Sequence, residues 1–211
     1  LVLGAGEYSP LMMARIYQTI AVDGTRTPLR SIRSIVNRDG EVLRRNFTEY
    51  ERAVAPEAVH LLRYALREVV REGTGRGVYR YLDRDFHVAG KTGTTNDGRD
   101  SWFAGFSGDL LAVSWIGRDN NAATGLTGST GALRVWADFM ADAAVRPLQY
   151  RMPAGVELHW VDDRSGRLTG EGCEGARLLP FIAGSEPRES TGCVRRSDGV
   201  RGWFERLFRG A

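Results

Sequence analysis

The stretch VAGKTGTTNDGRDSWFAGFSGDLLAVSWIG, residues 88–117, decides the fold. It contains three runs of strand-forming residues, which cover about residues 87–95, 101–107 and 110–117. The sequence NDG at residues 96–98 separates the first two runs, and GD at residues 108–109 separates the last two. Because both separators are typical of tight turns, the stretch predicts three consecutive strands paired as an antiparallel meander.

Helices are expected on either side of this meander. A capped amphipathic helix begins at Ser9-Pro10 and stops at Gly24, and a second runs over about residues 56–72. A third is marked by apolar residues at helical spacing, namely Leu133, Trp136, Met140 and Ala144. A peripheral hairpin is expected over residues 31–47, around the turn sequence NRDG at residues 37–40. The pattern predicts an α+β fold in which helices pack on an antiparallel sheet.

Length and composition limit the function. The 211 residues, 42% of them hydrophobic, suffice for one domain with a tail. The net charge of +3 is too small and too scattered to indicate a nucleic-acid partner. The sequence contains neither an apolar run of roughly 20 residues nor a signal peptide. Since the chain opens at Leu1 without a methionine, we expect a fragment or processed product whose first sheet strands are missing.

The composition changes near Pro147, which suggests a main domain over residues 1–147 and a small appended tail over residues 148–211. Cys173 and Cys193 lie in a loop-rich part of the tail, at a spacing that suits a local disulfide. A disulfide would indicate an oxidising compartment such as the periplasm, whereas two free thiols would fit a cytosolic protein.

The chain ends in a predicted amphipathic helix. Its apolar residues follow helical spacing: Val200, Trp203, Phe204, Leu207 and Phe208. The opposite face is rich in arginine. Three docking surfaces remain open for this helix: its own domain, a partner protein, or an anionic membrane surface.

Lys91 stands out because it is the only lysine among the 29 lysine and arginine residues. Alternation along a strand places Lys91 and Gly93 on one face and Thr92 and Thr94 on the other, unless the edge strand twists so that both sets border a cleft. A glycine at position 93 lets an extended ligand approach the strand closely and pair with it. The threonine hydroxyls can hold a carboxylate, and a backbone N–H near Thr94 can stabilise an oxyanion. The alternative is an ordinary exposed strand lysine.

The sequence Gly90-Lys91-Thr92 is also found in phosphate-binding P-loops. A P-loop requires a glycine five positions before Gly90, where this chain has Asp85. It also requires a helix after the lysine, where this chain predicts a second strand. We therefore reject a nucleotide-binding site.

The sequence GKTGTTND at residues 90–97 is followed by DSWFAG at residues 100–105 and VSWIGRD at residues 113–119. Lys-Thr-Gly is one of three signature elements of penicillin-binding proteins and β-lactamases. Over about residues 3–145, the series resembles the transpeptidase domain of class A, bifunctional penicillin-binding proteins. The cysteine-bearing tail is similar to that of the 1B type.

The resemblance implies a penicillin-binding/β-lactamase-like fold and a D,D-transpeptidase that cross-links peptidoglycan stem peptides through a serine acyl-enzyme and binds β-lactams. It places Lys91 in the proton relay and the Thr94 N–H in the oxyanion hole. Its substrate-binding set is Thr92, Gly93, Thr94, Thr95 and Trp102. A packing role is the favoured alternative for Trp102, which the resemblance places near the cleft. It implies no cofactor or metal ion, and a location at the periplasmic face of the bacterial inner membrane, with the anchor outside this chain.

Two of the three signature elements are absent. The residue three positions before the only lysine is Val88, so the chain has no Ser-x-x-Lys, and it has no Ser-x-Asn. We therefore expect the isolated chain to be inactive, with the nucleophile upstream. The three histidines, and Tyr8, Asp100 and Asp119, are expected to be ordinary surface or turn residues.

Two alternatives stay open on the same fold. The first is a non-catalytic β-lactam or muropeptide sensor. The second is a module whose tail contacts cell-envelope regulator proteins.

Overall fold

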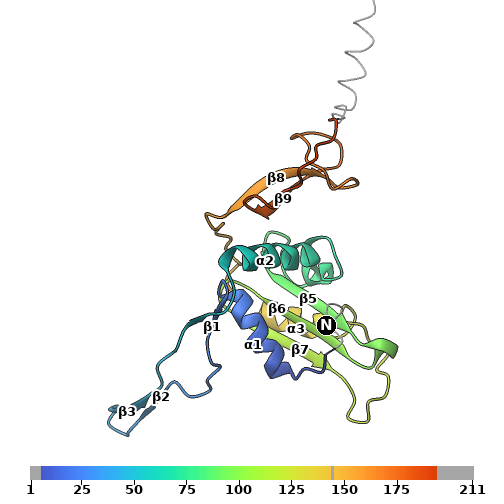
Figure 1. The fold of residues 1–211 in the computed structure, drawn as a ribbon. Helices are drawn as coiled ribbons and strands as arrows, with labels where there is room; N and C mark the ends of the chain where they lie inside the picture. The colour runs from blue at the N-terminus through green and yellow to red at the C-terminus, as the bar shows by residue number, and fades with distance from the viewer. Residues whose placement is uncertain (1–5, 144, 194–211) are drawn as a thin grey trace, which may run out of the picture. The chain divides into compact units, whose positions relative to one another are not determined.

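A computed structural model describes residues 6–143 and 145–193 of the chain. The chain divides between Met152 and Pro153 into two compact units. Figure 1 shows the elements of the first unit, which are α1 (Pro10–Ala21), β1 (Thr25–Arg26), β2 (Ser34–Val36), β3 (Val42–Arg45), β4 (Glu51–Arg52), α2 (Pro56–Arg71), the 3-10 helix η1 (Arg76–Arg80), β5 (Ala89–Thr94), the 3-10 turn η2 (Asn96–Gly98), β6 (Ser101–Phe106), β7 (Leu111–Ile116) and α3 (Ala132–Asp142).

The predicted meander is the centre of the first unit. Its strands pair antiparallel in the order β5-β6-β7, and Lys91 of β5 lies opposite Ala104 of β6. Side chains therefore alternate between two faces of this sheet. The α+β architecture predicted from the sequence is confirmed. The two-residue pair β1 and β4 was not predicted, because two residues are too few to show an alternating pattern.

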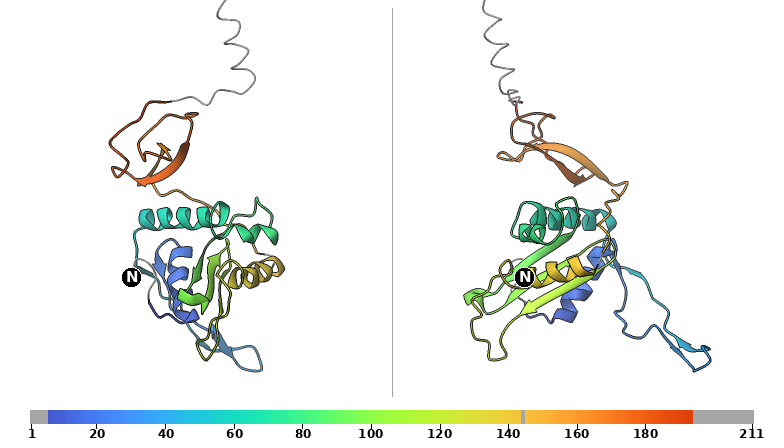
Figure 2. Two further views of the ribbon diagram at one scale, coloured as in Figure 1. Left: turned by 90° about the vertical axis from the view of Figure 1, so that its right-hand side faces the viewer. Right: turned by 180° about the vertical axis from the view of Figure 1, so that it is seen from behind.

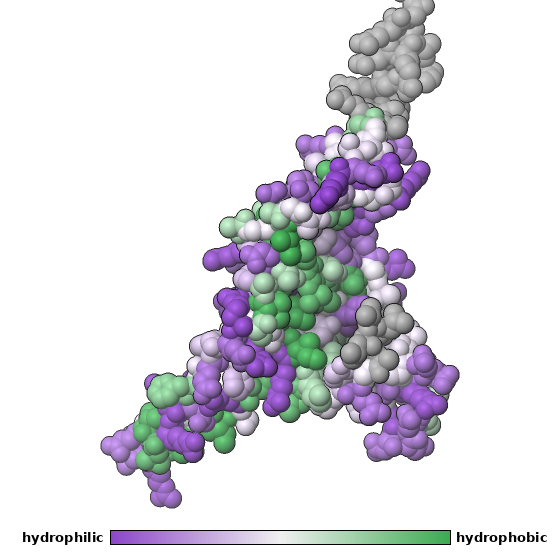
Figure 3. Space-filling model, viewed as in Figure 1, coloured by the Kyte–Doolittle hydropathy of each residue, from purple (hydrophilic) through white to green (hydrophobic). Residues whose placement is uncertain are grey.

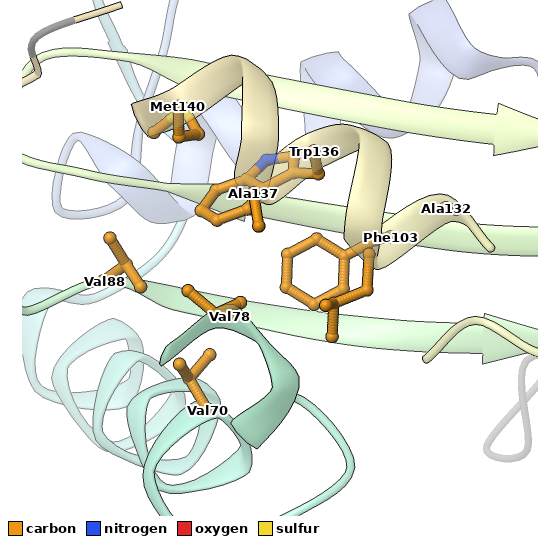
Figure 4. Close-up of a cluster of buried hydrophobic side chains, with 9 residues drawn as sticks. Val70, Val78, Val88, Phe103, Ala132, Trp136, Ala137 and Met140 are labelled. Carbon is orange, nitrogen blue, oxygen red and sulfur yellow. The ribbon is translucent and has the colours of Figure 1, made fainter. Parts of the chain in front are cut away.

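Helix α3 covers one face of the sheet. Trp136 and Met140 of α3 are buried against Phe103 of β6, and the rings of Phe103 and Trp136 lie 4.8 Å apart (Figure 4). Val70 of α2 and Val78 of η1 belong to the same cluster. Burying so many large apolar side chains fixes the sheet against α3 and holds its strands in register.

The opposite face packs against α1 and α2, so that α1 and α3 lie on opposite sides of the sheet (Figure 2). Tyr17 of α1 and Leu66 of α2 are buried there against Phe106. Burial raises the pKa of Tyr17 to about 12. Leu148 is buried in the same cluster and Tyr150 packs against it. The first compact unit therefore continues beyond the boundary predicted at residue 147.

The helices α1 and α2 begin and end where the sequence predicts. The Ser9 hydroxyl accepts a hydrogen bond from the backbone N–H of Met12 at 3.3 Å, which caps the start of α1. Gly24 has a φ of +85°, and a Cβ at this position would lie 2.3 Å from the Val54 carbonyl oxygen. Only glycine fits that turn. Among the described helices, none is long and apolar enough to cross a bilayer.

Strands β2 and β3 form the predicted peripheral hairpin. The Asn37 side-chain oxygen accepts hydrogen bonds from the backbone N–H groups of Asp39 and Glu41, at 3.0 and 2.8 Å. Gly40 has a φ of +82° in the same turn. All residues of both strands are exposed, so local turn chemistry rather than a core defines this hairpin.

The second unit is a small antiparallel pair of β8 (Val156–Asp162) and β9 (Ala176–Ile182). A disulfide joins Cys173 and Cys193 in this unit. The amphipathic helix predicted over residues 200–208 lies outside the described residues. The assignment of the tail as an appended module stays a prediction.

Candidate functional site

Strand β5 lies at an edge of the three-stranded sheet. It pairs with β6 on one side, and within the described residues no strand pairs with its other edge. An edge strand carries backbone N–H and C=O groups that can pair with an extended peptide. Strand β5 therefore has the kind of free edge that strand addition requires, within the described residues.

Lys91 and Gly93 lie on the face of the sheet that packs against α1 and α2. Lys91 is exposed, and its Nζ donates to the Thr92 carbonyl oxygen at 2.8 Å. Gly93 pairs with Trp102, and a Cβ at Gly93 would lie 3.0 Å from the Trp102 Cβ. Trp102 thus lies beside the glycine. The lysine amine lies beside the edge of β5 with which no described strand pairs.

Thr92 and Thr94 lie on the opposite face, and both hydroxyls have partners in the chain. The Thr92 Oγ1 lies 2.6 Å from the Thr74 Oγ1, in the loop that follows α2. The Thr94 Oγ1 accepts a hydrogen bond from the Gly128 backbone N–H at 2.9 Å. Since a hydroxyl both donates and accepts, each threonine retains hydrogen-bonding capacity for a ligand.

The loop before α3 fixes the end of β5. A Cβ at Gly128 would lie 2.7 Å from the Gly93 carbonyl oxygen, so this backbone approaches β5 closely. The buried Ser101 hydroxyl donates to the Thr127 carbonyl at 2.8 Å and accepts from the Ala132 N–H at 2.8 Å. These contacts join residues about 30 positions apart, and no local sequence signal indicated them.

Thr95 and Asp100 close the turn between β5 and β6. The Asp100 backbone N–H donates to the Thr95 Oγ1 at 2.8 Å, and that hydroxyl donates to the Asp100 carboxylate at 3.1 Å. The Trp115 Nε1 donates to the other carboxylate oxygen at 2.9 Å. Asp100 was expected to be an ordinary turn residue, but it links β7 to the end of the candidate substrate strand.

Two histidines make their described side-chain contacts with other residues. His60 is buried on α2, where its ring packs edge-on against Tyr150, and burial lowers its pKa. His159 belongs to the second unit, where its Nε2 lies 3.3 Å from Glu157. In the part of the chain that the structure describes, no three His, Cys, Asp or Glu side chains are grouped as a metal site requires.

Comparison with known proteins identifies the family. Residues 3–124 match the penicillin binding protein transpeptidase domain. The chain is 34% identical to penicillin-binding protein 1B of Escherichia coli (strain K12), over 99% of this chain and 28% of that protein. The chain therefore spans less than a third of that relative.

Two solved structures support the same relationship. The crystal structure of penicillin-binding protein 1A from Haemophilus influenzae is 25% identical with a TM-score of 0.82, over 91% of this chain and 34% of that one. Penicillin binding protein 3 of Mycobacterium tuberculosis, complexed with aztreonam, is 25% identical with a TM-score of 0.51, over 70% of this chain and 38% of that one.

The family match covers more than half of the residues and contains all of β5, β6 and β7. It agrees with the resemblance seen in the Lys-Thr-Gly segment and its flanking strands. The chain belongs to the penicillin-binding protein transpeptidase domain family.

Proposed function

We propose that this chain is the Lys-Thr-Gly part of a peptidoglycan D,D-transpeptidase. The observation that carries the proposal is the edge strand β5, where an exposed lysine and a side-chain-free glycine lie on the same face. Membership of the transpeptidase family supports a chemical role for this edge. The donor stem peptide would add to β5 as an extended strand.

Each group on β5 has a distinct role in this proposal. The Lys91 amine supplies positive charge for the donor and takes part in proton transfer. The Thr92 and Thr94 hydroxyls hold the donor carboxylate, with Thr95 beside them. The Thr94 N–H stabilises the oxyanion that develops on the attacked carbonyl. Trp102 supports the bound strand at Gly93.

The reaction proceeds in two acyl-transfer steps. A serine oxygen attacks the carbonyl carbon between the two terminal D-alanines, the C–N bond breaks, and the leaving amine takes the proton. An acceptor amine then attacks the resulting ester. The new C–N bond forms, the C–O bond to serine breaks, and the amine proton returns to the serine oxygen.

We propose that the serine belongs to a part of the polypeptide outside this chain. The 211 residues contain no Ser-x-x-Lys, and the chain spans 28% of the Escherichia coli relative. A mainly apolar groove of about 1000 Å³ is lined in part by α1 and α2, and its lining residues Ile16 and Leu62 are 44% and 43% exposed. Figure 3 shows hydrophobic surface over this part of the first unit. We propose that the rest of the transpeptidase domain packs on this groove, because large exposed apolar surfaces usually mark interaction sites. Leu62→Glu should lower the Tm of the longer protein, and an unchanged Tm would contradict this assignment.

The disulfide between Cys173 and Cys193 supports a periplasmic location, since such bonds persist in oxidising compartments. The enzyme would act at the outer face of the inner membrane and bind β-lactams. Aztreonam, bound in the solved structure of the Mycobacterium tuberculosis relative, is one of these compounds.

The test is product formation by the longer protein that contains this chain. Uncross-linked peptidoglycan should give cross-linked stem-peptide dimers with release of D-alanine, measured by mass spectrometry of digested product. A donor peptide that forms a persistent acyl-enzyme without dimers would favour a sensor instead. Absence of both the acyl-enzyme adduct and the cross-linked dimer would refute both functions.

A protein-interaction role is a second candidate for the tail, because residues after Met152 form a compact unit of their own. Pull-down of cell-envelope proteins by the longer protein should weaken when residues 153–211 are removed. Equal capture with and without them would remove this candidate.

A further inference from the structure

A cavity of about 310 Å³ lies at the end of β5, beside the residues that follow the Lys-Thr-Gly element. Its chemically distinctive lining consists of Glu7, Tyr8, Thr95, Asp100, Trp102 and Trp115. We propose that this cavity is a cation subsite that first binds the acceptor stem peptide through its primary ammonium group, which then loses one proton to solvent before the neutral amine attacks the ester. This inference rests on the proposed transpeptidase function and names a place for its second substrate.

The lining suits a cation rather than an anion. Two carboxylates and three aromatic rings border the cavity, and no lysine or arginine is among its described lining residues. The rings of Trp102 and Trp115 lie 6.1 Å apart at an angle of 50°. Aromatic rings attract ammonium groups through their negative faces, and carboxylates add direct charge complementarity.

Asp100 is oriented before any ligand arrives. One carboxylate oxygen accepts from the Trp115 Nε1 at 2.9 Å, and the other accepts from the Thr95 hydroxyl at 3.1 Å. Because an ionised carboxylate has about four acceptor positions, these bonds leave capacity for an ammonium group. A preoriented group loses little conformational entropy on binding.

The cavity adjoins the donor strand without overlapping the lysine. Trp102 lies opposite Gly93, on the same face as Lys91, and Thr95 follows β5 directly. Thr95 lies four positions after Lys91, which corresponds to about 13 Å along an extended strand. That separation exceeds the Debye length of about 8 Å at physiological ionic strength. The cationic and anionic ends of one strand can therefore attract the donor carboxylate and the acceptor ammonium to different places.

The experiment separates the two half-reactions in the longer protein. A thioester donor forms the acyl-enzyme, and a tripeptide with a free side-chain amine then competes with water for it. Glu7→Gln and Asp100→Asn preserve shape while removing charge. Glu7→Gln should leave the acylation rate unchanged, and transfer by Asp100→Asn is measured against hydrolysis of its own acyl-enzyme, because Asp100 also holds Thr95. Together they should lower the ratio of transfer to hydrolysis roughly tenfold, since each exposed ion pair contributes up to about fivefold.

Glu41→Gln is the matched control, because Glu41 is an exposed carboxylate on the β2–β3 hairpin outside the cavity lining. It should change neither half-reaction. Normal acylation with an unchanged transfer ratio in the double variant would overturn the cation subsite. Absence of acylation in the unaltered protein would instead overturn the transpeptidase function. If Asp100→Asn lowers the Tm, Glu7→Gln alone still decides the proposal, with an expected decrease of about threefold.

Discussion

The two faces of β5 differ in whether their polar side chains already bond to other parts of the chain. On the α3 side, Thr92 contacts Thr74 and Thr94 accepts the Gly128 N–H. On the other side, Lys91 is exposed and bonds only a carbonyl of its own strand in the described contacts. One face therefore anchors the strand, while the other presents charge to a ligand. We call the face with Lys91 and Gly93 the open face and the face with Thr92 and Thr94 the anchored face. Substitutions on the open face should affect catalysis most, and substitutions on the anchored face should affect stability as well.

Lys91→Ala should have the largest effect. Removing the amine from the longer protein should lower the rate of β-lactam acylation by at least about 100-fold, because proton transfer typically contributes that much or more. The free energy of unfolding should change by less than about 0.5 kcal/mol, since the side chain is exposed. Acylation kinetics with a fluorescent penicillin and a urea titration measure the two quantities.

Two companion variants sharpen this result. Lys91→Arg keeps a positive charge but not a compact, titratable amine, and it should stay severely impaired. Arg134→Ala removes an exposed cation from α3 and should leave acylation unchanged. A normal acylation rate in Lys91→Ala would mean that the lysine on the open face takes no part in acylation.

Gly93→Val should have the next largest effect. A Cβ at this position lies 3.0 Å from the Trp102 Cβ, and a branched side chain would also obstruct an approaching strand. Acylation should decrease by roughly tenfold or more, because small displacements of a substrate cost large factors in rate. The acylation rate of Gly93→Ala should lie between those of the unaltered protein and Gly93→Val in the same assay. Equal rates for all three would exclude close strand pairing at this position.

Thr94→Val should have a smaller and mixed effect. The valine cannot accept the Gly128 N–H, so the free energy of unfolding should decrease by about 1 kcal/mol. Acylation should also decrease, but less than in Lys91→Ala. Thr48→Val, at an exposed position before β4, provides the control for losing a hydroxyl. A variant as stable as the unaltered protein would show that the Gly128 contact does not anchor β5.

A pH effect on α2 should be the smallest. Burial lowers the pKa of His60 in the folded chain, so the unfolded chain binds more protons below about pH 6.5. Stability should therefore be fully present above that value and should decrease as the pH falls toward the lowered folded pKa. His60→Gln should flatten this dependence in thermal unfolding between pH 5 and pH 8, values that bracket an ordinary histidine pKa. An unchanged slope would assign the acid sensitivity to other groups.

The sequence predicted the elements that local patterns specify. Alternation and turn residues gave β5 to β7, and the Ser9 cap and Gly24 marked the limits of α1. The alternation of Lys91 and Thr92 between two faces also followed from the strand period alone. These features depend on residues a few positions apart.

The contacts that anchor β5 were not predictable in the same way. Ser101 bonds to Thr127, and Trp115 bonds to Asp100, across sequence separations of 26 and 15 residues. Such bonds depend on where the chain returns after a loop, which no short pattern encodes. The cavity at Asp100 was missed for this reason, because a single aspartate before a strand has no distinctive signal.

Intact mass after exposure to a β-lactam tests the central claim most directly. The longer protein should gain the mass of one β-lactam, with the adduct mapped to a serine outside these 211 residues. The isolated chain should gain none, and the Lys91→Ala variant of the longer protein should gain none within the time that the unaltered protein needs for complete acylation. An adduct on a serine of this chain, or no adduct on the longer protein, would contradict the account.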